Sequence, residues 1–367
     1  MTSADSLTAA DPARVELLCD LERWADALPL ISRLLAGEPE NNVAWCLLAQ
    51  CHLGLGRPEP ALSAARSAAA LDPENEWPHR LISFAATNLG RHDEAVQAAR
   101  ESVRLEPEAW QTHVRLAAAV TRQNAGLSRR ARRQRARTMP DEAVTAADRA
   151  MALAPDEPQV QLIYGSVAAG HGRTAVAERA YRAALALDPQ SSGAHHLLAA
   201  LRLRRRGGPA GLADAATGFV TALTVDPSAQ VSRRSLELTL RVFLARVAYG
   251  LFVVAYLSQV FALGTAAWAR VVPMLLLALP AWFVIGFRQR LSPPLRSFLR
   301  QLLSRGAPAV AAGLEVTSVV LILIGALAPQ PVRALAAISA AAVALFARLA
   351  LHLDTRRLLR APRPPNR

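Results

Sequence analysis

Three residues near the start of the chain, Cys46, Cys51 and His52, are of the types that ligate transition metals. A metal site needs several ligands that converge, but a five-residue spacing divides the two thiols around a helix, and no second ligand cluster follows in the sequence. We therefore predict that these side chains pack in a core, and we expect neither a metal nor another cofactor. The odd count of three cysteines also argues against a disulfide framework and favours a reducing compartment.

Motifs that carry out catalysis are not found in the sequence. It has no phosphate-binding loop, Rossmann glycine pattern, metal-ligand pair or nucleophile elbow, and the stretch GGPAG at 207–211 is not preceded by a strand pattern. His195 and His196 are adjacent, so on a helix they point to different faces. We expect a protein that is not an enzyme.

Three ionisable residues lie inside long apolar segments: Glu315, Arg246 and Arg348. Such residues within a membrane mark a functional site by default, so this intramembrane charge cluster is a candidate ion or proton site. A pathway would need more polar residues than these segments offer, and arginine side chains can reach the headgroups. We therefore favour structural pairing of Glu315 with one of the arginines.

A dense run of arginines occupies the stretch LSRRARRQRARTMP and consists of Arg129, Arg130, Arg132, Arg133, Arg135 and Arg137. The plainest interpretation is a solvated loop. The next is docking onto anionic lipid headgroups, where each basic residue contributes roughly 1 kcal/mol. Binding of RNA or DNA phosphates is the third, and no aromatic platform or nucleic-acid-binding fold accompanies the run. We expect an anionic lipid surface as partner rather than nucleic acid, and keep nucleic-acid tethering as an alternative.

A proline ladder organises the first part of the chain. Pro39, Pro73 and Pro107 are 34 residues apart, and Pro155 and Pro189 repeat the interval. A fixed period near 34 indicates stacked helical hairpins. The intervals of 48 and 38 residues that end at Pro155 and Pro227 are longer by 14 and 4, and we place both insertions between the two helices of a hairpin.

These units resemble the tetratricopeptide repeat, most closely over 42–75, where Trp45, Leu48, Gly56, Ala61 and Pro73 stand at the family's positions. The pattern recurs six times between residues 8 and 229, with a degenerate first unit. The resemblance implies an all-α solenoid whose first helices (helix A) line a concave, partner-binding face. The family's second helices are called helix B below.

The resemblance places a candidate partner-binding stripe on helix A of successive units. Its members are Trp77, Arg80, Phe84, Asn88, Arg122, Gln159 and His196. Trp, Phe and Arg are common anchors of recognition surfaces. The equally weighted alternative is that Trp77 and Phe84 pack between neighbouring helices. The family's subset that clamps acidic C-termini uses Lys and Asn at set positions; this chain has no Lys, so we do not expect that mode.

Charge is divided unevenly along the chain. All 42 basic residues are Arg, which fits a GC-rich, most often bacterial, coding bias, and the formal net charge is +13. Residues 1–230 hold 25 Arg and 26 Asp and Glu, a net of −1, whereas residues 231–367 hold 17 Arg and 3 acids, a net of +14. The chain is thus a near-neutral domain followed by a basic and very apolar one.

Four apolar segments in the second part approach the ~20 residues that span a bilayer. We expect a four-helix transmembrane region with spans at 242–264, 270–287, 308–327 and 333–352. Arginines gather before the first span, in loop 288–306 and in tail 353–367, which places these parts inside. The N-terminus has no apolar core of a signal peptide, which agrees with this orientation.

The expected organisation is therefore a tail over 1–7, six repeats over 8–229 with a basic insertion at 122–139, and a capping helix over 230–241 before the spans. We predict a multi-pass cell-membrane protein with cytoplasmic repeats and C-terminus. Its function would be that of a scaffold that recruits protein partners without covalent chemistry. The alternatives are a regulatory or structural subunit of a transporter or channel, and nucleic-acid tethering.

Overall fold

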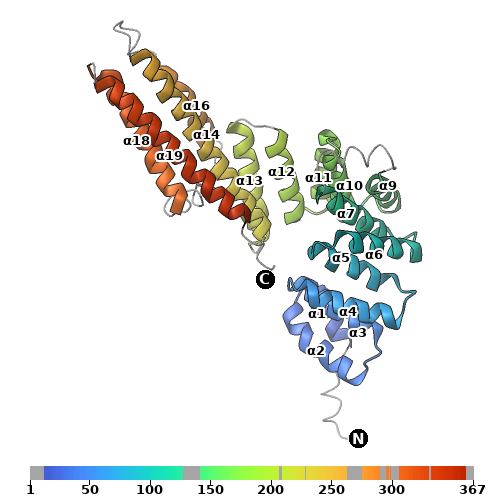
Figure 1. Cartoon of the computed structure of the whole chain (residues 1–367). Coiled ribbons are helices and arrows are strands. Elements are labelled where there is room, and N and C mark those ends of the chain that lie inside the picture. Colours follow the sequence, from blue (N-terminus) through green and yellow to red (C-terminus); the bar gives the residue numbers. More distant parts are fainter. Residues whose placement is uncertain are drawn as a thin grey trace. The chain divides into compact units, whose positions relative to one another are not determined.

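The computed structural model describes residues 12–126, 141–205, 209–227, 229–262, 275–289, 295–296, 298, 306–329 and 332–360. Every regular element in these ranges is an α-helix. The chain divides into two compact units, the first ending at Pro189 and the second beginning at Gln190 (Figure 1).

Helical hairpins build the first unit. A short pair begins it, α1 (Pro12–Asp20) and α2 (Trp24–Gly37). Four longer hairpins follow, whose A helices are α3 (Asn42–Gly54), α5 (Glu76–Asn88), α7 (Trp110–Gly126) and α10 (Pro158–Gly170). Their B helices are α4 (Pro58–Leu71), α6 (His92–Leu105), α9 (Glu142–Leu153) and α11 (Thr174–Leu187). Each A helix packs against its own B helix, and α3, α5 and α7 also pack against the A helix of the following hairpin.

Glycine makes the turn within the regular hairpins. Gly56, Gly90 and Gly172 each follow an A helix with φ of 69°, 77° and 76°, a conformation that is costly for residues with a Cβ. In the hairpin that carries the long insertion the corresponding position is Asn124, which lies within α7. The A helix therefore continues to Gly126, so the first residues of the expected insertion 122–139 are helical, and residues 127–140 lie outside the described part.

At the opposite end of the hairpins, the A helix is hydrogen-bonded to the closing proline of the preceding unit. The carbonyl oxygen of the closing proline accepts a hydrogen bond from the side chain six residues further on, in the next A helix. The pairs are Trp45 with Pro39 at 2.8 Å, His79 with Pro73 at 3.2 Å, His113 with Pro107 at 2.8 Å and Gln161 with Pro155 at 2.8 Å. These bonds satisfy carbonyls that have no partner within the preceding helix.

Small residues fill the contacts between helices of the first unit. Alanines dominate two hydrophobic clusters of its described residues, and at Gly165 an added Cβ would lie 2.6 Å from the ring of Tyr181. Cys46 and Cys51 are fully buried, and the Sγ atoms of Cys19 and Cys51 lie 3.6 Å apart as free thiols. The prediction that the cysteines are core residues is confirmed.

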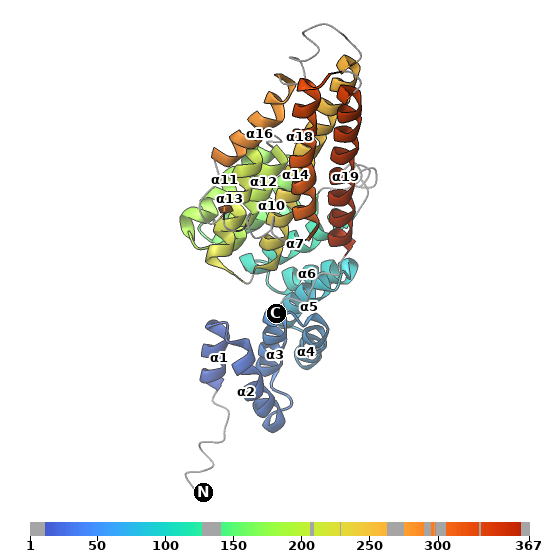
Figure 2. The ribbon, with the colours of Figure 1, turned by 90° about the vertical axis from the view of Figure 1, so that its left-hand side faces the viewer.

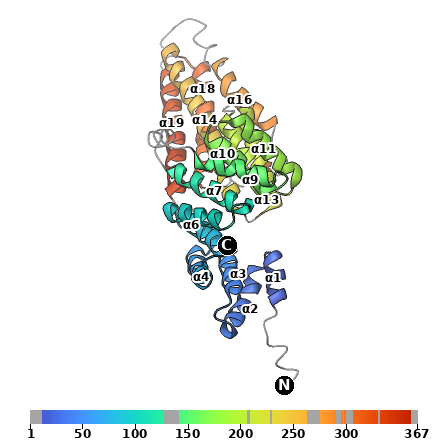
Figure 3. The same ribbon diagram turned by 90° about the vertical axis from the view of Figure 1, so that its right-hand side faces the viewer.

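The second unit contains one further hairpin and the apolar helices. The hairpin is α12 (Ser192–Arg205) and α13 (Pro209–Val225). The helices that follow are α14 (Gln230–Ala262), α16 (Ala278–Gln289), α18 (Gly306–Leu327) and α19 (Val332–Arg360). Helices α14, α18 and α19 run side by side in Figures 2 and 3.

A single hydrophobic cluster joins the sixth hairpin to the apolar helices. It extends from Ala199 and Phe219 on the hairpin through Leu240 on α14 to Leu351 on α19. Phe243 also stacks on Phe287 of α16 with ring centres 3.9 Å apart. The region expected to cap the repeats and the region expected to enter the membrane are one continuous helix, α14.

Two described helices, α14 and α19, contain segments that are long and apolar enough to cross a membrane: residues 230–257 and 334–353. These correspond to the first and fourth expected spans. Helix α18 supplies a shorter apolar segment over 308–324, and the second expected span is described only from Leu275 onward.

Candidate partner-binding surface

Helix α5 carries the first four residues of the expected stripe. Asn75 begins this helix, and its Oδ1 accepts a hydrogen bond of 3.0 Å from the backbone N–H of Trp77. The Trp77 ring is half-buried and packs against the clusters on both sides of α5. Trp77 therefore packs between neighbouring hairpins, as in the packing alternative.

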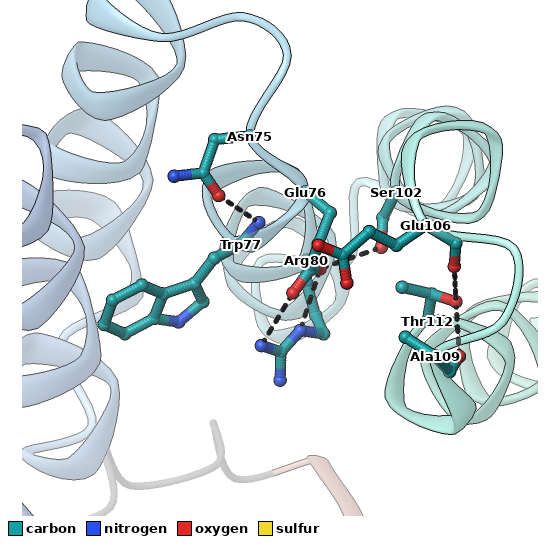
Figure 4. A network of polar contacts seen from close by, with 8 residues as sticks. All are labelled: Asn75, Glu76, Trp77, Arg80, Ser102, Glu106, Ala109 and Thr112. Carbon is teal, nitrogen blue, oxygen red and sulfur yellow. Dashed lines mark hydrogen bonds and ion pairs between the residues drawn. The ribbon is translucent and has the colours of Figure 1, made fainter.

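Arg80 is held within a polar network rather than presented freely (Figure 4). Its Nε and Nη2 donate to the two carboxylate oxygens of Glu76 at 3.1 and 3.0 Å, and Ser102 Oγ on α6 donates to Glu76 at 3.3 Å. Glu76 is buried, so these bonds compensate a carboxylate removed from water. Near the start of α7, Thr112 Oγ1 donates to the carbonyl oxygens of Glu106 and Ala109, which precede this helix.

Phe84 is the exposed aromatic residue of the stripe, with 44% of its surface accessible. The guanidinium of Arg115, on the adjacent helix α7, lies 5.2 Å from the centre of its ring. That distance is within the range of cation–π contacts. Asn88 on α5, Arg122 on α7 and Gln159 on α10 are also exposed. Together with Phe84, these residues are called here the A-helix surface.

Arg115 was not singled out from the sequence. It is only 9% exposed, and Nη2 donates to Thr87 Oγ1 at 3.3 Å, while Nε has no partner within the described residues. Burial, and secondarily the positive charge of Arg122, lowers the pKa of Arg115 to about 10.

A comparison of the repeat units with one another would have found Arg115. The position eight residues after the closing proline is Leu47, Leu81, Ile163 and Leu197 in the other units, and is charged only at Arg115. The signal is a cation in a position that is otherwise aliphatic.

His196, the last member of the expected stripe, belongs to the second unit. Its Nδ1 lies 3.1 Å from Ser232 Oγ of α14, and its ring lies 5.2 Å from that of Phe219. Burial lowers the pKa of His196. These contacts join the sixth hairpin to α14, so the side chain is used in packing.

The arginine run from Arg129 to Arg137 lies outside the described residues. A pocket of about 440 Å³ lies on the B-helix side of the first unit, away from the stripe. It is lined mainly by α4, with Glu59, Ser63, Arg66, Ser67 and Arg91 as its polar residues.

Glu315, Arg246 and Arg348 lie on the apolar helices α18, α14 and α19. Glu315 is 8% exposed, and its Oε1 has no hydrogen-bond partner among the residues that the structure describes. The Arg348 guanidinium instead lies 4.8 Å from the ring centre of Tyr249 on α14. Arg246 and Arg348 are both exposed, whereas Glu315 faces inward.

Stacked antiparallel hairpins with a 34-residue period define the class of this protein as a helical-repeat solenoid joined to apolar helices. Residues 20–102 match the family model described as anaphase-promoting complex, cyclosome, subunit 3, and residues 128–192 match the model described as tetratricopeptide repeat. The repeat region belongs to the tetratricopeptide repeat family.

Two of the solved structures that match the chain are named as tetratricopeptide repeat proteins. A thermophilic tetratricopeptide repeat protein from Thermus thermophilus is 20% identical over 54% of this chain and 98% of its own, with a TM-score of 0.48. A tetratricopeptide repeat protein from Parabacteroides merdae is 16% identical over 63% and 86%, with a TM-score of 0.49. MamA from Desulfovibrio magneticus RS-1 is 20% identical over 51% and 96%, with a TM-score of 0.36. No curated protein sequence matches the chain.

Proposed function

We propose that this protein is a membrane-anchored scaffold whose tetratricopeptide repeats recruit partner proteins to the inner face of a membrane. The observation that carries the proposal is the joining of two kinds of structure in one chain. Repeats of a protein-interaction family occupy the first unit, and helices of membrane-spanning length occupy the second.

Membrane insertion is supported by the surface of the apolar helices. Large apolar side chains are exposed along α16, α18 and α19, including Leu279, Trp282, Val316, Leu335 and Phe346. A soluble domain rarely exposes so much contiguous apolar surface, whereas lipid chains would cover it. We propose that all four apolar segments span the bilayer, with α14 and α19 as the longest.

Orientation follows from the arginines. Arginines gather in the first turns of α14, between α16 and α18, and in the last turns of α19 with the residues after it. In contrast, the α14–α16 connection contains only Arg270, and the α18–α19 connection contains none, with Arg333 at the start of α19. Short basic segments stay on the cytoplasmic side. The repeats would therefore lie in the cytoplasm together with the C-terminus.

The sixth hairpin would couple the two functions. It shares one hydrophobic cluster with α14 and α19, so a membrane anchor would hold this hairpin rigidly rather than by a flexible tether.

Topology is tested by labelling single cysteines in the full chain after Cys19, Cys46 and Cys51 are replaced by alanine. Thr265→Cys, between the first two spans, should react with a membrane-impermeant maleimide in intact cells. Ser292→Cys, in the arginine-rich connection, should react only after permeabilisation. Equal labelling of the two positions in intact cells would contradict the proposed topology.

Partner recruitment is tested by proximity labelling in the native cell with the full chain. Replacing exposed Phe84, Asn88 and Arg122 together by alanine should remove specific partners from the labelled set. The matched control replaces Gln97 and Arg179, which are exposed on the B helices α6 and α11. An unchanged partner set for the first variant would overturn the assignment of the A-helix surface.

A transporter or channel subunit is the second candidate, and the buried Glu315 favours it. A carboxylate in an apolar bundle whose Oε1 lacks a partner among the described residues is a potential ion-binding group. Loss of ion or proton flux in Glu315→Gln, with membrane insertion retained, would support this function; unchanged flux in reconstituted vesicles would exclude Glu315 as its site.

A further inference from the structure

The buried arginine of the third full hairpin is the feature that packing does not account for. Arg115 replaces an aliphatic side chain of the other units, and a guanidinium is costly to remove from water unless an acidic group or several acceptors compensate it. Thr87 Oγ1 and the Phe84 ring are its contacts within the described residues. Neither carries a negative charge.

Among the described residues, the contacts of Arg115 include no acidic group of the neighbouring elements. Glu76 on α5 is already bound by Arg80 and Ser102, and Asp93 on α6 accepts a hydrogen bond of 2.6 Å from Gln123. The segment 127–140 that follows α7 contains no acidic residue. Arg122, which lies two turns along α7, adds positive charge at the same site.

From this arrangement we propose that Arg115, with Phe84, Asn88 and Arg122, forms a binding site for a carboxylate side chain of a partner peptide. The site rests on the proposed scaffold function and names the chemistry of its ligand. Arg115 would donate to the carboxylate from its free N–H groups, and Arg122 would add charge at the exposed edge.

A peptide carboxylate fits this site better than a lipid phosphate. The guanidinium fork binds a carboxylate or a phosphate in two parallel hydrogen bonds, so the apolar neighbour of Arg115 decides between the two. The exposed ring of Phe84 lies directly beside it and offers an apolar contact for the neighbouring peptide side chain. The recognised feature would therefore be an Asp or Glu next to an apolar residue.

The site also explains why Arg115 is kept partly desolvated. Charged hydrogen bonds gain strength where water is excluded, and a cation already buried loses little further hydration when the ligand binds. Thr87 accepts a hydrogen bond from Nη2 and holds one edge of the guanidinium in place. Nε is buried, so the incoming anion would be met by Nη1 and by the second N–H of Nη2.

The test uses the solubilised full chain and random dodecapeptides displayed on phage, selected on the native protein. The selected peptides are then synthesised in pairs, with each Asp or Glu either retained or replaced by Asn or Gln. We expect one acidic position to be shared, and its neutralisation to weaken binding by about 10- to 100-fold. Arg115→Leu should weaken binding to a similar degree.

Arg115→Leu is informative because it restores the residue type of the other units. Its thermal unfolding midpoint should equal or exceed that of the parent, so lost binding cannot be attributed to unfolding. Arg179→Leu, which removes the same charge from an exposed position on α11, should leave peptide binding unchanged.

Three outcomes would overturn the carboxylate site: selected peptides without a shared acidic residue, peptides that bind Arg115→Leu as tightly as the parent, or displacement of bound peptide by phosphatidylglycerol vesicles acting through Arg115. If the selected peptides bind the A-helix surface without acid dependence, this inference fails while the scaffold function stands. Absence of any partner in proximity labelling would instead remove the scaffold function itself.

Discussion

The side-chain amide of Gln161 donates a hydrogen bond of 2.8 Å to the carbonyl oxygen of Pro155, six residues earlier. The same bond is made in three other hairpins by a tryptophan and two histidines. The carbonyl belongs to the residue that ends one unit and the donor to the first helix of the next. The bond thus fixes where each new hairpin starts.

Loss of this bond should destabilise the first unit. Gln161→Met keeps the length of the side chain but removes the donor, and we expect a cost of about 1 kcal/mol in the free energy of unfolding. Urea unfolding of the full chain, followed by tryptophan fluorescence, measures it. Gln159→Met on the same helix is the control and should change stability by less than about 0.5 kcal/mol.

The close approach of α10 and α11 at Gly165 gives a second prediction. Alanine has the higher helix propensity, but the new Cβ of Gly165→Ala would overlap the buried ring of Tyr181. We expect a net destabilisation of about 1–3 kcal/mol. Gly170→Ala, at the end of the same helix where nothing lies within 4 Å, should be neutral or stabilising; similar effects of both changes on the melting temperature would contradict the packing argument.

The buried carboxylate of Glu76 should be necessary for the stability of its hairpin. Glu76→Ala leaves Arg80 and Ser102 without their acceptor, and we expect a loss of about 2–3 kcal/mol. Glu74 is 80% exposed and contacts Arg104 at 3.8 Å, so Glu74→Ala should cost almost nothing. Hydrogen exchange in α5 and α6 measures the difference.

Alkaline pH should weaken the first unit through its cysteines. Burial raises the pKa of Cys46 to about 12, and burial likewise raises the pKa of Cys51. A thiol whose pKa is raised by folding stabilises the native state below its ordinary pKa of 9.0, and this contribution is lost as the pH rises toward 12. The loss is up to about 1.4 kcal/mol per pH unit for each thiol.

Urea unfolding between pH 8 and pH 11 measures this dependence. Cys46→Ala should reduce the slope above pH 9 while leaving the transition cooperative. An identical slope in this variant and in the parent would show that Cys46 does not titrate on unfolding.

The proline period was sufficient to predict the hairpins of the first unit because each proline ends a helix by a local steric rule. The turn glycines and the small residues at helix crossings followed from the same frame. Prediction was weaker where the outcome depends on contacts between units. The stripe on α5 was located by spacing, yet spacing alone could not decide that Trp77 packs between clusters while Phe84 stays exposed.

Arg115 shows a different limit. Burial of this position could be inferred only by aligning the repeat units, in which the other residues are aliphatic, and not from the residues around it in α7. Only the neighbouring helix, with Phe84 and Thr87, determines what the guanidinium meets. The pairing of Glu315 was similarly open, because hydropathy places a residue in an apolar helix without defining which side it faces.

The bond to the closing proline has a consequence for how such repeats diverge. Tryptophan, histidine and glutamine have little in common except a side-chain N–H group at a similar distance from the backbone. A unit can therefore change its residue at this position and keep the hydrogen bond to the preceding proline. The inherited property is therefore a donor at a given distance rather than an amino acid. The bond is intact at His113, in a hairpin whose residues 103–127 fall between the two matched family models.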